Sequence, residues 1–147
     1  MKIPTYRLSL VRESDVEYDE RFTCRTPSAA ARLIWDVLKD EPNEVMGCLM
    51  LDKRQRVMGL NITFRGTQDR MAVDPRPFLQ AALLSNSAGI LIFHNHPSGD
   101  PSPSVEDIAF TKRLREAGEC VGATLVDHII VGSHHKYHSM KERGNLN

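Results

Sequence analysis

Cysteine is scarce in this chain of 147 residues, and the three cysteines present form no recognisable pattern. Cys24, Cys48 and Cys120 are odd in number, and no two of them make a Cys-x-x-Cys pair. This spacing argues against a disulfide framework and against a zinc site built from cysteines. We interpret Cys48, which lies in an apolar stretch, as a small core residue.

Long hydrophobic runs and an excess of one charge are also missing. No apolar run approaches the length of a membrane span, and the N-terminus lacks the hydrophobic region of a secretory signal. Lys plus Arg and Asp plus Glu each number 19, so the formal net charge is zero. A DNA-binding module normally carries a basic surplus or stripe. We therefore expect a cytoplasmic protein with no membrane segment, and the net charge does not support nucleic acid as a partner.

One local basic cluster qualifies that charge argument. Lys112, Arg113 and Arg115 lie close together in a stretch with helical spacing. Charged residues at such spacing normally form the solvent-facing side of a helix. We adopt that interpretation over a nucleic-acid patch.

Helix and strand patterns alternate along the sequence, which is typical of an α/β fold. With 147 residues, 41% of them hydrophobic, the chain is sized for one domain with one core. We divide it into residues 1–24, an edge strand and irregular segment, and residues 25–147, one globular unit. The predicted strands cover residues 6–11, 44–52, 56–66, 88–93, 123–131 and 137–140, and the predicted helices cover residues 26–39, 74–85 and 104–117.

Caps and stop signals set the predicted helix ends. Thr26 and Asp74 each precede a proline and so resemble N-caps followed by a proline in the first turn. Gly118 is expected to end the third helix.

Two histidines and a carboxylate have a spacing that suits a catalytic metal site. His94 and His96 follow an apolar run, and residues i and i+2 of a strand point to the same face. Asp107 lies eleven residues past His96, in the first turn of the predicted helix, where it can turn back as a third ligand. Two histidines and one carboxylate leave a tetrahedral zinc with one open position, as catalysis requires.

The same residues also have a purely structural interpretation. Ser104 followed three residues later by Asp107 fits the capping box of a helix, and the two roles of Asp107 are compatible. Asp100 competes with Asp107 as the carboxylate ligand, although it lies only four residues past His96 within a Gly-Pro turn.

A metal-bound water also needs a base. Glu44, at the start of an apolar strand, is the candidate. From the residues alone, a solvated carboxylate at a strand end is the favoured interpretation of Glu44.

Taken together, these residues resemble the motif of the JAB/MPN metalloprotease family, also called JAMM. Its pattern is a Glu, a distant His-x-His, seven residues, Ser, two residues and Asp, and the chain carries it as Glu44, His94, His96, Ser104 and Asp107. Within that family the chain is most similar to bacterial RadC-type proteins. Three segments carry this likeness, which covers roughly residues 25 to 143: Phe64-Arg-Gly-Thr67, His94-Asn-His-Pro-Ser-Gly-Asp-Pro-Ser-Pro-Ser104 and Asp127-His-Ile-Ile-Val-Gly132.

The resemblance implies a fold, a cofactor and a reaction. It implies a mixed, curved sheet flanked by helices, related to the deaminase-like fold, with zinc at the strand ends. Its ligands would be His94, His96 and Asp107, which also decides against Asp100. Glu44 would move the proton, and Ser104 would help to stabilise the oxyanion. The implied substrate is a peptide or isopeptide bond in a protein or peptide, while the natural substrate and the oligomeric state stay open.

Three other functions compete with hydrolysis. The RadC-type likeness allows a DNA repair or DNA-transaction factor, but the N-terminal helical segment of longer RadC-type proteins has no room here. A non-catalytic scaffold would typically lack a ligand, and this chain keeps all of them. A non-haem iron site also uses two histidines and one carboxylate, but the ligand order and Glu44 speak against it.

The remaining histidines have weaker signals. His128 has two open interpretations: a contact behind the ligand histidines, with Asp127 as an orienting acceptor, or a hydrogen-bonded core histidine. His134, His135 and His138 lie in a polar stretch and are interpreted as surface residues.

Overall fold

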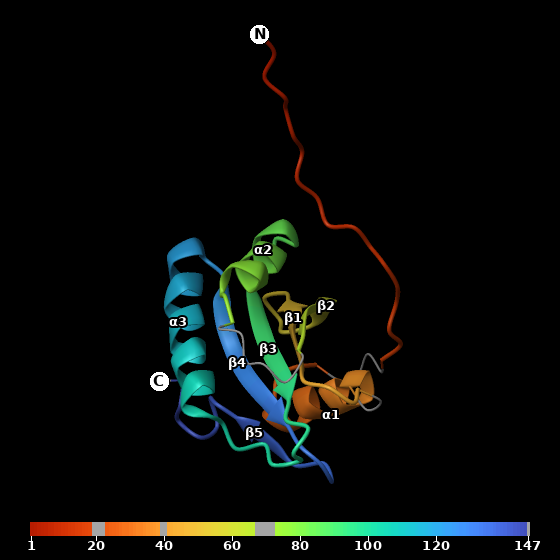
Figure 1. The fold of residues 1–147 in the computed structure, drawn as a ribbon, viewed down its shortest axis with the longest axis vertical. Coiled ribbons are helices and arrows are strands. Elements are labelled where there is room, and N and C mark those ends of the chain that lie inside the picture. Colours follow the sequence, from red (N-terminus) through yellow and green to blue (C-terminus); the bar gives the residue numbers. More distant parts are fainter. Residues whose placement is uncertain (19–22, 39–40, 67–72, 147) are drawn as a thin grey trace.

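Five strands of the chain form one mixed sheet with three helices packed on it (Figure 1). The structure is a computed structural model that describes residues 1–18, 23–38, 41–66 and 73–146. Over these residues the elements are α1 (Pro27–Leu38), β1 (Val45–Leu51), β2 (Val57–Arg65), α2 (Arg76–Leu84), β3 (Gly89–Asn95), α3 (Val105–Val121), β4 (Thr124–Val131) and β5 (Tyr137–Ser139).

The strand order is β2-β1-β3-β4-β5. β3 and β4 run parallel, and the other neighbouring pairs run antiparallel. A parallel pair needs a crossover connection, and α3 supplies it between β3 and β4. The predicted α/β class, with a mixed sheet flanked by helices, is confirmed.

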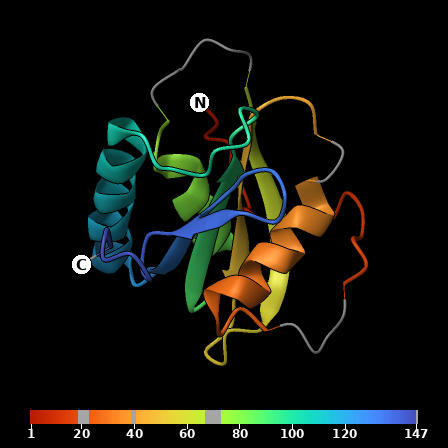
Figure 2. The same ribbon diagram turned by 90° about the horizontal axis from the view of Figure 1, so that it is seen from below.

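Helices cover both faces of the sheet, and Figure 2 shows α1 and α3 on opposite sides of it. Side chains of successive strand residues point to opposite faces. In β3, Leu91 and Phe93 therefore pack with α1, whereas Ile90 and Ile92 pack with α2 and α3. This alternation explains why β3 reads as a continuous apolar run, as expected of a central strand covered on both sides.

The predicted helix starts are right at α1 and partly wrong at α2. Thr26 caps α1, since its Oγ1 accepts a hydrogen bond from the backbone N–H of Ala29 at 3.2 Å. At α2 the cap position is Pro75, with no side-chain cap. Asp74 lies one residue earlier, and its carboxylate accepts from the N–H of Arg76 at 2.9 Å.

Several predicted boundaries need correction. α3 continues through Gly118 and ends at Val121, with Gly122 at φ 75° as its C-cap. β3 extends two residues beyond its predicted end at Phe93, which brings His94 into the strand. The predicted end of the first helix at Lys39, and Thr67 of the Phe64–Thr67 motif, lie outside the described residues.

The predicted edge strand over residues 6–11 is wrong. Residues 1–18 contain no strand and extend away from the sheet (Figure 1). Tyr6 and Leu8 are 84% and 80% exposed. Alternating hydrophobicity specifies a strand only where it pairs with a sheet edge, and residues 1–18 pair with neither edge strand of the described sheet, β2 or β5.

Across the described ranges, no helix combines the length and the apolar character that a membrane crossing requires.

Candidate metal centre

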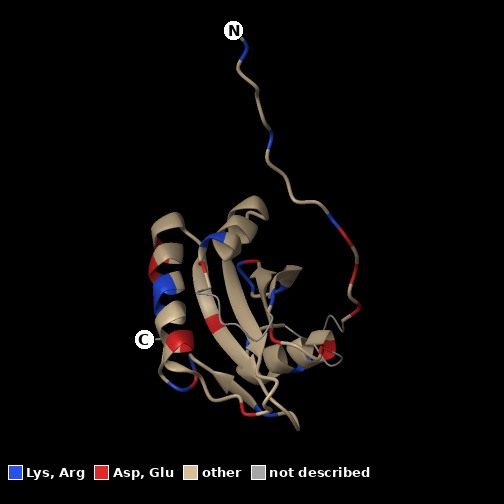
Figure 3. Cartoon of the chain, viewed as in Figure 1, with Lys and Arg blue, Asp and Glu red and all other residues tan. Residues whose placement is uncertain are grey.

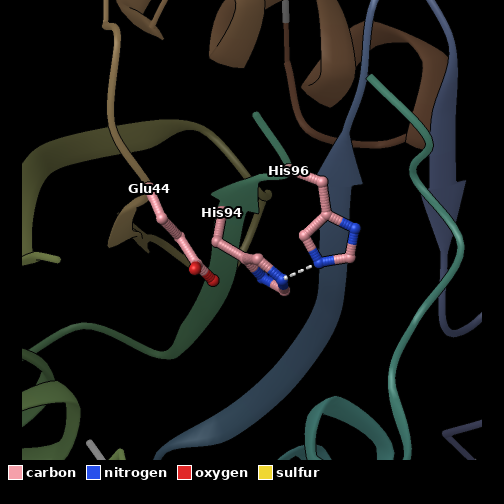
Figure 4. Close-up of side chains that lie close together, drawn as sticks. All are labelled: Glu44, His94 and His96. Atoms are coloured by element: carbon pink, nitrogen blue, oxygen red, sulfur yellow. Dashed lines mark hydrogen bonds between the residues drawn. The ribbon is translucent and has the colours of Figure 1, made fainter. Parts of the chain in front are cut away.

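The site begins at the end of β3, where polar residues replace the apolar row that faces α2 and α3. His94 continues the row of Ile90 and Ile92 and is 1% exposed. His96 follows the strand, and its backbone N–H still donates to Val131 O at 3.0 Å. The two Nε2 atoms lie 3.0 Å apart, drawn as the dashed line in Figure 4.

Asp107 joins the two histidines from the first turn of α3. Its carboxylate oxygens lie 3.4 Å from Nε2 of His94 and 3.3 Å from Nε2 of His96. The capping box is also formed: Ser104 Oγ accepts from the Asp107 N–H at 3.0 Å, and Asp107 Oδ2 accepts from the Ser104 N–H at 2.8 Å. Ser104 therefore starts the helix that carries Asp107 to the histidines.

The geometry of these three side chains fits a tetrahedral zinc ion. Zinc binds histidine nitrogen and carboxylate oxygen at about 2.0–2.1 Å, so two ligand atoms of a tetrahedron lie about 3.3 Å apart. The two Nε2 atoms lie 3.0 Å apart, close to that value, and the two carboxylate oxygens of Asp107 lie one against each ring, Oδ1 at 3.4 Å from His94 and Oδ2 at 3.3 Å from His96. The donor set also suits the metal, because two imidazoles and one carboxylate leave a fourth position open.

Glu44 lies across from the histidines, just before β1. One ligand atom from each of Glu44, His94 and His96 lies within 4.8 Å of the others, and Figure 4 shows the Glu44 carboxylate directed toward the rings. Glu44 is exposed, whereas His94 is buried and His96 is half-buried. Its carboxylate therefore faces both the cluster and the solvent.

The charges of the cluster support one another. Burial alone would raise the pKa of Asp107, but the adjacent His94 and His96 rings hold it well below its usual range. Contact with the Asp107 carboxylate raises the pKa of His96 against the effect of burial. Asp107 is thus ionised at neutral pH, as a metal ligand must be.

The competing carboxylate has a different place. The Asp100 carboxylate accepts from the N–H of Ser102 at 2.9 Å and so belongs to the loop. The backbone oxygen of Asp100, however, accepts from Nδ1 of His96 at 2.8 Å. Because a carbonyl only accepts, Nδ1 of His96 carries a proton, so in the neutral ring Nε2 has the lone pair that a metal ion would need. No residue pattern reveals such a main-chain acceptor, which is why sequence reasoning missed it.

Behind His94 the structure places His128 and not Asp127. Nδ1 of His94 lies 2.7 Å from Nε2 of His128, which is completely buried. Asp127 instead accepts from the Ser139 hydroxyl at 2.5 Å and from the backbone N–H of Lys141 at 3.0 Å, and so ties β4 to the C-terminal turn. Burial raises the pKa of this carboxyl. Both interpretations of His128 describe it: it contacts His94 from behind, and it is a hydrogen-bonded histidine of the core, while Asp127 is not the acceptor for its ring.

The three C-terminal histidines stay apart from this cluster. His134 and His135 are exposed, and Nε2 of the half-buried His138 lies 3.1 Å from Asn145 Oδ1. The surface assignment therefore holds for His134 and His135 and only in part for His138.

Comparisons with known proteins place the chain in a family. A family model described as RadC-like JAB domain matches residues 24–145, and the chain therefore belongs to the RadC-like JAB domain family. Its relatives include a UPF0758 protein of Listeria monocytogenes, 43% identical over 138 residues, which make up 94% of this chain and 59% of the relative. A UPF0758 protein of Bacillus cereus is 39% identical over 131 residues, 89% of this chain and 58% of the relative. The chain thus spans about three-fifths of the length of these curated relatives.

Proposed function

We propose that the protein is a zinc-dependent hydrolase that cleaves a peptide or isopeptide bond. The observation that carries the proposal is the convergence of His94, His96 and Asp107, whose facing atoms lie 3.0, 3.3 and 3.4 Å apart, with the Glu44 carboxylate facing them. Membership of the JAB domain family supports it, while the names of the relatives specify no activity.

Each side chain has one task in this proposal. His94, His96 and Asp107 would hold zinc, which when bound supplies the Lewis acidity that makes water a nucleophile at neutral pH. Glu44 takes a proton from the attacking water at its carboxylate and delivers it to the leaving nitrogen. Ser104 Oγ accepts from the Asp107 N–H and still has a hydroxyl proton, which it donates to the carbonyl oxygen as negative charge develops there.

A Glu44→Gln variant separates the proton-transfer role from metal binding. It should retain zinc and lose about 10²–10⁴-fold in hydrolysis rate, since the amide cannot accept the proton. His94→Ala should lose both zinc and hydrolysis. Glu119→Gln is the matched control, because Glu119 lies twelve residues further along α3 than Asp107.

The substrate for this test is an amine-blocked peptide library that also contains lysine side chains acylated by short peptides. Mass spectrometry then counts the new amino groups that each variant releases. A parental protein that releases no more than Glu44→Gln would contradict the proposal. Metal analysis of untagged protein provides a second criterion, and iron in place of zinc would overturn the zinc assignment.

The DNA-transaction alternative predicts salt-sensitive affinity for duplex DNA. Figure 3 shows both signs of charge along α3, where the basic cluster Lys112, Arg113 and Arg115 lies. No observation at the site favours this alternative.

A further inference from the structure

A line of hydrogen bonds runs behind His94 through buried side chains of three elements. Nδ1 of His94 lies 2.7 Å from Nε2 of His128, and Nδ1 of His128 lies 2.6 Å from Oγ1 of Thr111. Thr111 Oγ1 in turn lies 2.6 Å from the backbone oxygen of Asp107. His94, His128 and Thr111 are 1%, 0% and 0% exposed, so water does not compete for these bonds. We call this line the hydrogen-bond chain.

The direction of every bond in the chain follows from its last member. The Asp107 backbone oxygen has no hydrogen, so the Thr111 hydroxyl must donate to it. A hydroxyl has only one proton, so Thr111 Oγ1 can only accept from the ring of His128. Nδ1 of His128 therefore carries a proton.

The same reasoning then passes through the two rings. His128 is completely buried, and its two ring nitrogens face a ring nitrogen and a hydroxyl rather than a carboxylate, so the ring is neutral and has a single proton. With that proton on Nδ1, Nε2 of His128 can only accept. Nδ1 of His94 must donate to it, which places the proton of a neutral His94 on Nδ1 and the lone pair on Nε2. That nitrogen is the one that faces Asp107 and His96.

The opposite direction would leave a buried defect. If Nε2 of His128 carried the proton, the Thr111 hydroxyl would have to turn to Nδ1 of His128. Two oxygens 2.6 Å apart would then have no proton between them. Buried polar groups that lack a partner are strongly disfavoured, so the chain has one stable direction.

The second ligand histidine is oriented by a shorter route. His96 lies in a loop and donates directly to the backbone oxygen of Asp100. His94 lies under α3, where the acceptor behind it is a ring nitrogen, and two side chains connect it to a backbone oxygen. The backbone oxygen at the end of the hydrogen-bond chain belongs to Asp107. The carboxylate of the same residue lies against Nε2 of His94, so Asp107 is connected with both nitrogens of the His94 ring.

We propose that Thr111 and His128 are positioning residues that fix the Nδ1–H tautomer of His94, so that its Nε2 is open to zinc. The purpose of the hydrogen-bond chain rests on the proposed zinc site, whereas its direction does not.

The direction can be measured on the metal-free protein. Long-range ¹H–¹⁵N correlation spectra distinguish a protonated ring nitrogen from an unprotonated one, and each signal is assigned by the loss of one histidine at a time. We expect His128 to carry its proton on Nδ1. A proton on Nε2 of His128 would overturn the inference, whether or not any variant folds.

Zinc affinity tests the consequence, with Thr111→Val and Thr111→Ser as a matched pair. Valine keeps the shape but removes the acceptor, which frees His128 to take the wrong tautomer. Serine keeps the hydroxyl. We expect Thr111→Val to weaken zinc binding in a chelator competition about 10- to 100-fold, the usual effect of removing a group that orients a ligand. Thr111→Ser should stay near the parental affinity.

His128 provides a second pair. His128→Phe removes the acceptor for His94 and should weaken zinc binding by a similar factor, whereas His128→Gln keeps a side-chain oxygen that can accept from Nδ1. Folded Thr111→Val and His128→Phe proteins with parental zinc affinity would overturn the inference. A parental protein that takes up no zinc would contradict the proposed function, and the tautomer of His128 would still decide the direction of the chain.

Discussion

Asn95 lies between His94 and His96, but its side chain serves Glu44. Strand alternation directs it to the opposite face of β3 from His94. There its Oδ1 accepts from the backbone N–H of Val45 at 2.7 Å, and its Nδ2 donates to the backbone oxygen of Asn43 at 3.0 Å. Asn95 therefore holds the main chain on both sides of Glu44. The ends of β1 and β3 are joined at the point where the proposed base must face the proposed ligands.

Replacing Asn95 should misplace the base and leave the ligands in position. We expect Asn95→Ala to lower kcat about 10- to 100-fold, because displacements near 1 Å cost that much. Zinc affinity should stay within about threefold of the parent, since the hydrogen bonds that orient His94 and His96 do not involve the Asn95 side chain. Asn43→Ala is the matched control, because only the backbone oxygen of Asn43 takes part. Cleavage of the peptide library and chelator competition measure the two quantities, and a parallel loss of zinc would show that Asn95 supports the ligands instead.

The sequence predicted the members of the cluster better than their supports. The fixed spacing of His94, His96 and Asp107 reflects local strand and helix geometry, which a sequence pattern records well. The partners of the two histidines could not be found in this way. One is the backbone oxygen of Asp100, and the other is His128, a residue 34 positions from His94 on a neighbouring strand. The support that Asn95 gives to the main chain around Glu44 could not be predicted either, because nothing local connects the two residues.

α3 shows how two glycines of one helix can have different functions. Gly118 was predicted to end the helix, but it lies inside it, and its backbone oxygen accepts from the N–H of Ala123 at 2.9 Å. A Cβ at Gly118 would lie 2.3 Å from the backbone oxygen of Ala123. Gly122 ends the helix at φ 75°, and a Cβ there would meet nothing within 4 Å. The first glycine permits close approach of main chains, and the second permits a left-handed turn.

Gly118→Ala tests this distinction, because two arguments predict changes of opposite sign in the free energy of unfolding. Helix propensity alone predicts that alanine stabilises the protein by about 1 kcal/mol. The contact with Ala123 predicts destabilisation by about 1–3 kcal/mol, the usual cost of overpacking. We expect the contact to dominate, since a backbone oxygen cannot turn aside as a side chain can. Urea unfolding of the metal-free protein measures the free energy of unfolding. Gly122→Ala serves for comparison and is expected to destabilise the protein by about 1–2 kcal/mol, because residue 122 has a left-handed backbone conformation. A stabilised Gly118→Ala protein would show that the backbone of Ala123, before β4, can move away from the new methyl group at little cost.

The candidate site depends on the whole sheet. Glu44 precedes β1, His94 ends β3, Asp107 begins α3, and His128 lies in β4. The parallel pairing of β3 and β4, crossed by α3, brings the last three together. The predicted order of elements contains the strand, the helix and the strand of this crossover unit, although their parallel pairing was not predicted. The exact register could not be predicted, since β4 shifts its pairing with β3 near Val126 and so brings His128, next to Asp127, onto the α3 face.

The first eighteen residues take no part in this arrangement. Apolar side chains of the segment are exposed, with Ile3 at 88% and Leu10 at 49%. The polar contacts within it include a local pair between Arg12 and Asp15. Tyr18 Oη reaches Val57 O at 3.5 Å, the limit of a hydrogen bond. Such a segment adds little to the free energy of folding.

Removing residues 1–16 should therefore leave the rest of the molecule unchanged. We expect the free energy of unfolding to stay within about 0.5 kcal/mol of the parent, as for surface changes that bury nothing. Zinc affinity should not change, and limited proteolysis of the full chain should cut first within residues 1–18. The companion variant combines Leu8→Ser with Leu10→Ser in the full chain. If this segment were a strand packed on the sheet, the variant would lose two buried leucines, and each loss would lower the free energy of unfolding by about 1.5–3 kcal/mol. If either change lowers the stability by several kcal/mol, the alternating pattern of residues 6–11 does pair with a sheet edge in solution, as the sequence alone predicted.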